Sequence, residues 1–131
     1  MILFINTTEF NKLELALIGS GNVQKFDQEL AFNENFKTLE LLEKFLKKHK
    51  TSFTDIEQII ACSGPGSFTG IRVGLSLAQA FGFAQNIPVH TITKNKIPKN
   101  LIDLSGKKLA SQTTIFYGAK PNITKAKKKT R

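Results

Sequence analysis

The chain has 131 residues, a formal net charge of +9, and 40% hydrophobic residues that include eleven Phe but no Trp. This length supports one domain whose core draws most of its bulk from Phe. The single cysteine, Cys62, excludes an internal disulfide, and no apolar run approaches the roughly 20 residues that span a bilayer. The N-terminal residues lack the basic leader of a secretion signal. We therefore expect a cytoplasmic protein that does not enter the membrane.

The first third of the chain predicts three consecutive strands. Residues 2–6 form a short apolar run, and residues 13–18 are apolar apart from one Glu. A Gly-Ser-Gly-Asn turn at 19–22 then leads into a third candidate strand over 23–32. We expect the first two strands to pair antiparallel.

Residues 35–50 predict a helix in which Lys and Glu alternate with apolar residues. At about 100° per residue the apolar side chains cover roughly 220°, which is wider than contact with one sheet requires. The predicted core stripe comprises Leu39, Leu42 and Leu46, extended by Leu41 and Phe45 on one side and by Phe36 on the other.

A second helix is predicted over 68–85, between short strands at 59–62 and 88–92. Small residues recur at every fourth position of this helix, which predicts a smooth ridge and close approach to a sheet or another helix; they are Gly70, Gly74, Ala78 and Gly82. Here too the apolar arc is wider than a single buried face requires. The order βββαβαβ predicts an α/β fold with a mixed sheet and helices packed on it.

A glycine-rich turn joins the strand at 59–62 to the second helix, and it reads Gly64, Pro65, Gly66, Ser67, Phe68, Thr69 and Gly70. Both of the first two glycines can adopt positive φ, and Ser67 or Thr69 can cap the helix. Two interpretations are open: a purely structural turn, or an anion site at the start of the helix near Arg72. The dinucleotide spacing and the Walker A lysine are both absent.

No catalytic constellation follows from the sequence. His49 and His90 lack metal-ligand spacing, Cys62 lies in an apolar strand, and Ser67 is not in a GxSxG context. We therefore predict no catalytic residue, no metal and no cofactor.

Charge divides the chain in two. Residues 1–93 carry seven Lys and one Arg against nine acidic residues, whereas residues 94–131 carry ten Lys and one Arg against one Asp. We expect a nearly neutral domain over 1–93 and a basic, largely irregular tail over 94–131. One hypothesis for function is that this tail binds RNA, because clustered cations attract phosphates.

The strand end Asn6-Thr7-Thr8 and the run from Ser63 to Gly74 together resemble the bacterial TsaB (YeaZ) family, over about residues 1–93. The resemblance implies one lobe of an actin-like ATPase (ribonuclease H-like) fold. It also implies a non-catalytic role in making N6-threonylcarbamoyladenosine beside the tRNA anticodon. The partner would be TsaD, which transfers the threonylcarbamoyl group. The ATPase TsaE would join the assembly.

In that family the two helices pack against matching helices of TsaD as a four-helix bundle. The resemblance maps this interface onto Phe36, Leu41 and Phe45 of the first helix and onto Arg72, Leu75, Gln79 and Phe83 of the second. A homodimer through the same helices is an alternative partner.

Three departures from the family pattern stand out. The first strand ends in Asn6 rather than Asp, and Asn35-Phe36 replace the usual His at the start of the first helix. The basic tail stands where the family has a second lobe, so we expect no nucleotide binding by this chain alone. A reduced or inactive form of the family is therefore a further hypothesis.

Overall fold

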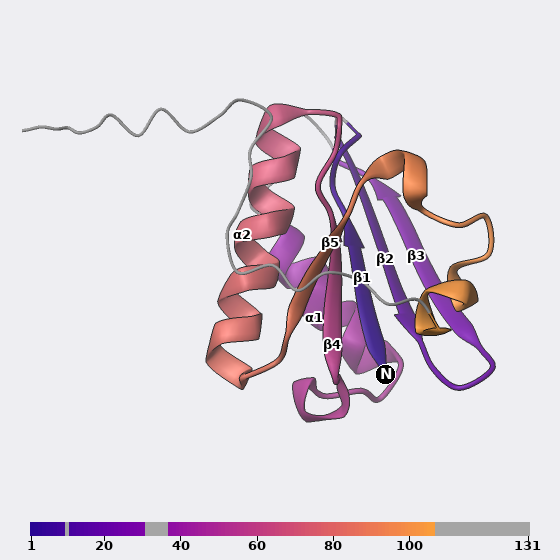
Figure 1. Cartoon of the computed structure of the whole chain (residues 1–131). Coiled ribbons are helices and arrows are strands. Elements are labelled where there is room, and N and C mark those ends of the chain that lie inside the picture. The colour runs from indigo at the N-terminus through magenta and orange to yellow at the C-terminus, as the bar shows by residue number, and fades with distance from the viewer. Residues whose placement is uncertain (10, 31–36, 107–131) are drawn as a thin grey trace, which may run out of the picture.

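A five-stranded mixed sheet organises the fold (Figure 1). The computed structural model describes residues 1–9, 11–30 and 37–106. The strands are β1 (Ile2–Asn6), β2 (Lys12–Ile18), β3 (Val23–Glu29), β4 (Gln58–Cys62) and β5 (Val89–Ile92). The helices are α1 (Thr38–Lys48) and α2 (Phe68–Gln85), with 3-10 turns η2 (Phe53–Asp55), η3 (Lys94–Lys96) and η4 (Leu101–Gly106).

The strand order is β3-β2-β1-β4-β5, which places the apolar first strand at the centre. The hairpin turn after Ile18 pairs β2 with β3 antiparallel, and β1 pairs with β2 antiparallel as well. The segments that contain α1 and α2 each lead into a strand with a parallel partner. β4, which follows α1, pairs with β1, and β5, which follows α2, pairs with β4. The predicted element order and the antiparallel first pair are confirmed.

Alternation along β1 supplies both faces of the sheet. Leu3 and Ile5 point into a cluster that includes residues of α1 and α2, whereas Ile2 and Phe4 point into a second cluster. Both helices therefore cover the same face, behind the sheet in Figure 1.

The opposite face of the sheet is covered by residues that follow β5. Leu101 and Leu104 of η4 are buried against Ile2, Phe4 and Ile60, and this segment crosses in front of the sheet in Figure 1. The division of the chain at residue 93 stays a prediction, but residues up to 104 contribute to the core. The predicted basic tail beyond residue 106 lies outside the described residues.

The first helix is rotated relative to its predicted core stripe. Leu42 and Leu46 are buried as expected, but Leu39 is 43% exposed, and Thr38 and Phe45 are buried instead. The prediction for Leu39 is wrong because Phe26 of β3 packs against Phe45, with 5.8 Å between ring centroids. That contact turns the Phe45 side of α1 toward the sheet.

No helix in the described ranges is long and apolar enough to cross a membrane.

Leu104→Ala tests the contribution of η4 to the core. Because Leu104 is fully buried, the truncation should lower the free energy of unfolding by about 2–5 kcal/mol, measured by urea denaturation. Lys99→Ala, at an exposed position before η4, is the control and should change it by less than about 0.5 kcal/mol. Equal effects of the two variants would show that η4 does not pack on the sheet.

Candidate functional site

The glycine-rich turn makes an unusually close contact with the end of β1. Gly64 has φ +108°, a left-handed conformation that glycine favours, and the Gly64–Pro65 peptide bond is cis. Gly66 is required for a different reason: a Cβ there would lie 2.3 Å from the backbone oxygen of Thr8. The prediction of positive φ at Gly66 is therefore wrong, because only Gly21 and Gly64 have it among the described glycines.

Ser67 caps α2, and it is one of the two residues, Ser67 and Thr69, that the sequence predicts as caps. Its Oγ accepts a hydrogen bond from the Gly70 N–H at 3.2 Å, and its own N–H donates to the Thr8 carbonyl at 2.6 Å. The Thr7 hydroxyl donates to the Gly70 carbonyl. The geometry supports the structural interpretation of the turn, since its polar groups hold α2 against β1.

The predicted ridge of small residues on α2 faces the sheet. Gly70, Gly74, Ala78 and Gly82 are all buried. A Cβ on Gly70 or Gly74 would lie 2.0 or 2.2 Å from atoms of Thr7. The ridge therefore fixes how closely α2 approaches β1.

Asn6, where the family usually has Asp, is held by hydrogen bonds within the fold. Its Oδ1 accepts from the Thr8 N–H at 3.0 Å and from the Thr8 hydroxyl at 2.7 Å. Its Nδ2 donates to Glu14 Oε1 at 3.0 Å, across the β1–β2 pair in which the two residues are partners. A carboxylate at position 6 could not make this last bond.

Asn6→Asp should make stability depend on pH. The substitution places two carboxylates about 3 Å apart, which raises the folded-state pKa of one of them above its unfolded value of about 4. Stability is then retained at acid pH and lost as pH rises through the raised pKa, by about 1–2 kcal/mol. Urea denaturation at pH 4 and pH 8 measures the difference.

Asn6→Asp combined with Glu14→Gln is the matched control. The Gln amide can donate to the new carboxylate, so the double variant should regain stability at neutral pH. A single variant with the pH profile of the unmodified chain would contradict the role assigned to the Asn6–Glu14 bond.

The predicted interface residues divide into three groups. Arg72 and Phe83 are exposed, with Phe83 at 93%, and Leu41 and Gln79 are half-buried. Phe36 lies outside the described residues.

Phe45 and Leu75 form the third group and are a correction, because they are 3% and 2% exposed and belong to the core. Phe45 packs between Phe26 and His49, and Leu75 lies one helical turn after the buried Ile71. Neither side chain offers surface to a partner in this structure.

Two exposed apolar residues were missed as surface positions. Leu39 is 43% exposed, and Phe68 is 46% exposed with the guanidinium of Arg72 lying 5.5 Å from its ring centroid. Phe68 was interpreted only as part of the turn, although its place as first residue of α2 could have indicated exposure.

The outer face of α2 is nearly free of charge. Arg72 is the only charged residue of this 18-residue helix. The exposed positions are Phe68, Thr69, Arg72, Ser76, Ala80, Phe83, Ala84 and Gln85. A helix this poor in charged side chains is typical of one that is covered on both sides.

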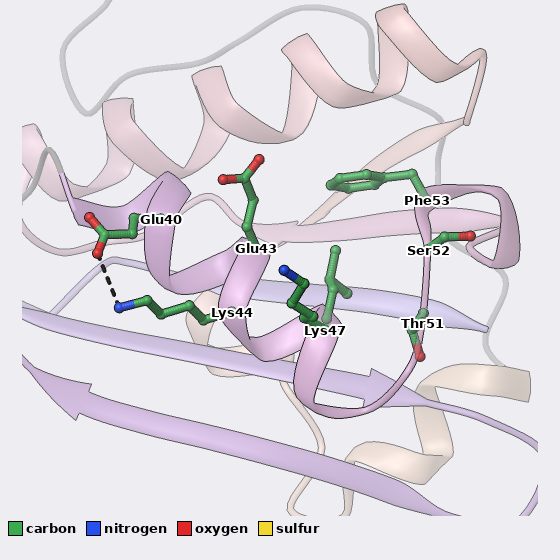
Figure 2. A pocket seen from close by; sticks show the side chains of 8 residues that line it. Glu40, Glu43, Lys44, Lys47, Thr51, Ser52 and Phe53 are labelled. Atoms are coloured by element: carbon green, nitrogen blue, oxygen red, sulfur yellow. Dashed lines mark ion pairs between the residues drawn. The ribbon is translucent and has the colours of Figure 1, made fainter.

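A groove of about 560 Å³ runs between α1 and the segment that follows it (Figure 2). Leu46 and Phe53 line it together with charged residues of both signs, of which Glu40 and Lys44 form an ion pair at 3.2 Å. The Phe53 ring stacks on Phe81 of α2 with centroids 4.2 Å apart. This stacking ties the segment after α1 to α2, so the two helices are held in one layer.

Within residues 1–9, 11–30 and 37–106, no group of three His, Cys, Asp or Glu side chains could hold a metal ion. Cys62 is buried, and that burial raises the pKa of its thiol.

Comparison with known proteins places the chain in a family. The family model described as "TsaD: tRNA N6-adenosine threonylcarbamoyltransferase" matches residues 32–97, half of the chain. A curated "tRNA threonylcarbamoyladenosine biosynthesis protein TsaB" from Buchnera aphidicola subsp. Baizongia pistaciae is 29% identical over 90 residues, covering 69% of this chain. The TsaB of Escherichia coli is 31% identical over 75 residues, which is 57% of this chain and 32% of that protein. This chain belongs to the TsaB (YeaZ) family.

The fold agrees with this family. YeaZ from Pseudomonas aeruginosa superposes with a TM-score of 0.65 at 22% identity, covering 70% of this chain and 43% of that one. The predicted α/β fold, a mixed sheet with helices packed on it, is confirmed, and its assignment as an actin-like (ribonuclease H-like) lobe stays a prediction. The chain spans about 40% of the length of the TsaB proteins from Buchnera and Bacillus subtilis.

Proposed function

We propose that this chain acts in the N6-threonylcarbamoyladenosine modification of tRNA as a non-catalytic subunit that binds a TsaD-like partner. Support comes from TsaB relatives named for threonylcarbamoyladenosine biosynthesis and from the match to the TsaD family model. TsaE would join the assembly, and the modification would take place in the cytoplasm. The partner would supply the catalytic groups.

The outer face of α2 carries this proposal. Phe83 is 93% exposed on a helix with one charge, and burying a Phe side chain in a partner would contribute about 1.5–3 kcal/mol. Arg72 and Phe68 form a cation–π pair nearer the N-terminus of the same helix, which extends this surface beyond Phe83. Aromatic and Arg side chains are the residue types that concentrate binding energy in protein interfaces.

The glycine ridge makes this face suitable for docking. Because Gly70, Gly74 and Gly82 bring the backbone of α2 close to the sheet, that side of the helix is used by the fold and the opposite side faces outward. At about 1.5 Å per residue α2 is about 27 Å long, enough to form one side of a helix–helix interface. The exposed Leu39 would add part of α1 to the same interface.

Phe83→Asp tests the interface directly. Since Phe83 is almost fully exposed, the variant should keep its melting temperature but bind a purified TsaD at least about 100-fold more weakly, measured by calorimetric titration. Gln85→Asp adds the same charge to the same helix and should weaken binding by less than about tenfold. Unchanged binding by Phe83→Asp would refute this surface. If the chain dimerises and Phe83→Asp abolishes the dimer, the surface is a homodimer interface instead.

Restoration of the tRNA modification in cells lacking TsaB tests the function itself. The chain should restore N6-threonylcarbamoyladenosine, detected by mass spectrometry of digested tRNA, and Phe83→Asp should fail to restore it. A chain that binds TsaD but restores nothing would favour the hypothesis of a reduced, inactive family member.

The alternative that the basic tail over 94–131 binds RNA falls largely on residues outside the described ranges. It remains a hypothesis from charge alone.

A further inference from the structure

A second groove lies on the other flank of α1, between that helix and the edge strand β3. Its volume is about 470 Å³. The described residues that line it are Lys25, Phe26, Gln28, Lys37, Glu40, Leu41, Lys44, Phe45, Lys48 and His49. This groove belongs neither to the glycine turn nor to the outer face of α2.

Positive charge dominates this groove. Four of the described lining residues are lysines, and the carboxylate among them, Glu40, is paired with Lys44 at 3.2 Å. Nearby carboxylates on the same two elements, Asp27, Glu29 and Glu43, do not line it. Lys25 on β3 and Lys48 on α1 add a cation to each wall of the groove besides that pair.

The lysines on the groove side of α1 form one row. Lys37, at the N-cap of the helix, and Lys44 and Lys48 within it are spaced by seven and four residues, which places them on one side with Leu41 among them. Lys25 stands on the opposite wall, on β3. A chain of negative groups lying in the groove would therefore meet cations from two elements.

The floor of the groove holds these walls at a fixed separation. Phe26 of β3 packs on Phe45 with ring centroids 5.8 Å apart, and Phe45 meets the edge of the His49 ring at 4.9 Å. The lysine stems rise from a packed apolar base, so their charged ends extend to solvent.

We propose that this groove binds the sugar-phosphate backbone of tRNA, with Lys25 and Lys48 contacting phosphates. The choice of tRNA as the ligand rests on the function proposed above. Lysine is a mobile point charge without the planar fork of Arg, which suits contacts to phosphates that position an RNA without reading its sequence. The described lining has no Arg side chain that would recognise a guanine edge.

The location of the groove allows tRNA and the protein partner to bind together. At about 100° per residue, Lys48 lies half a turn around α1 from Leu39, the exposed apolar residue on the other flank. The partner would contact the Leu39 flank and α2, and the RNA would contact the β3 flank.

The test compares two double variants of the full chain that change charge equally. Lys25→Glu with Lys48→Glu alters both walls of the groove, and Lys47→Glu with Lys50→Glu alters exposed lysines outside its lining. Affinity for an unmodified tRNA transcript is measured by fluorescence anisotropy across a KCl series. The basic tail is the same in both variants, so its contribution cancels.

The groove variant should bind the transcript at least about tenfold more weakly than the control variant at low salt. Its slope of log affinity against log salt should fall by about 2, one unit per lost phosphate contact. Equal losses in the two variants, or no loss in either, would overturn the proposal. Circular dichroism and thermal melting of both variants establish that they are folded.

Two further measurements separate this proposal from others. If poly-glutamate displaces tRNA no better from the unmodified chain than from the groove variant, the result supports an RNA site. If the groove variant loses poly-glutamate binding but keeps tRNA binding, the proposal is overturned in favour of an acidic protein as the ligand. Both variants should retain TsaD binding. If the unmodified chain does not bind TsaD, the proposed function is refuted. The comparison of tRNA affinity between the two variants then decides by itself whether the groove binds tRNA.

Discussion

The contact between the start of α2 and the end of β1 determines the geometry of the whole helical layer. Gly66, Gly70 and Gly74 each lie so close to Thr7 or Thr8 that a Cβ would come within 2.0–2.3 Å of their atoms. Glycines inside a helix cost about 1 kcal/mol each relative to Ala. The hydrogen bonds from Ser67 N–H and the Thr7 hydroxyl across this contact help to offset that cost.

This close approach of α2 to the sheet also determines how both helices pack. The Phe81 ring of α2 can reach Phe53, which in turn fixes the segment leaving α1. On its other flank α1 is fixed by Phe45 against β3. The two helices thus present different chemistry to solvent: α2 is nearly uncharged, and α1 carries a row of lysines.

Sequence reasoning succeeded where local pattern alone decides the structure. The bounds of α2, the order of the elements along the chain and the burial of the glycine ridge of α2 all follow from periodicity and turn chemistry. It failed for Leu39 and Phe45, since an apolar arc of about 220° has two flanks and periodicity does not say which one the neighbouring strand will cover. The position of Phe26 on β3 decides that, and it depends on tertiary packing.

The structural role of the turn could also be predicted only in part. Composition allowed a phosphate-binding loop, because free N–H groups at a helix start attract anions. In the structure two of these donors are already used: the Ser67 N–H by the Thr8 carbonyl, and the Gly70 N–H by the Ser67 hydroxyl. The residue that completes this corner is Asn6, whose amide joins Thr8 to Glu14, its partner in the β1–β2 register. A carboxylate at position 6 would face Glu14, so the amide suits a corner that holds a helix in place.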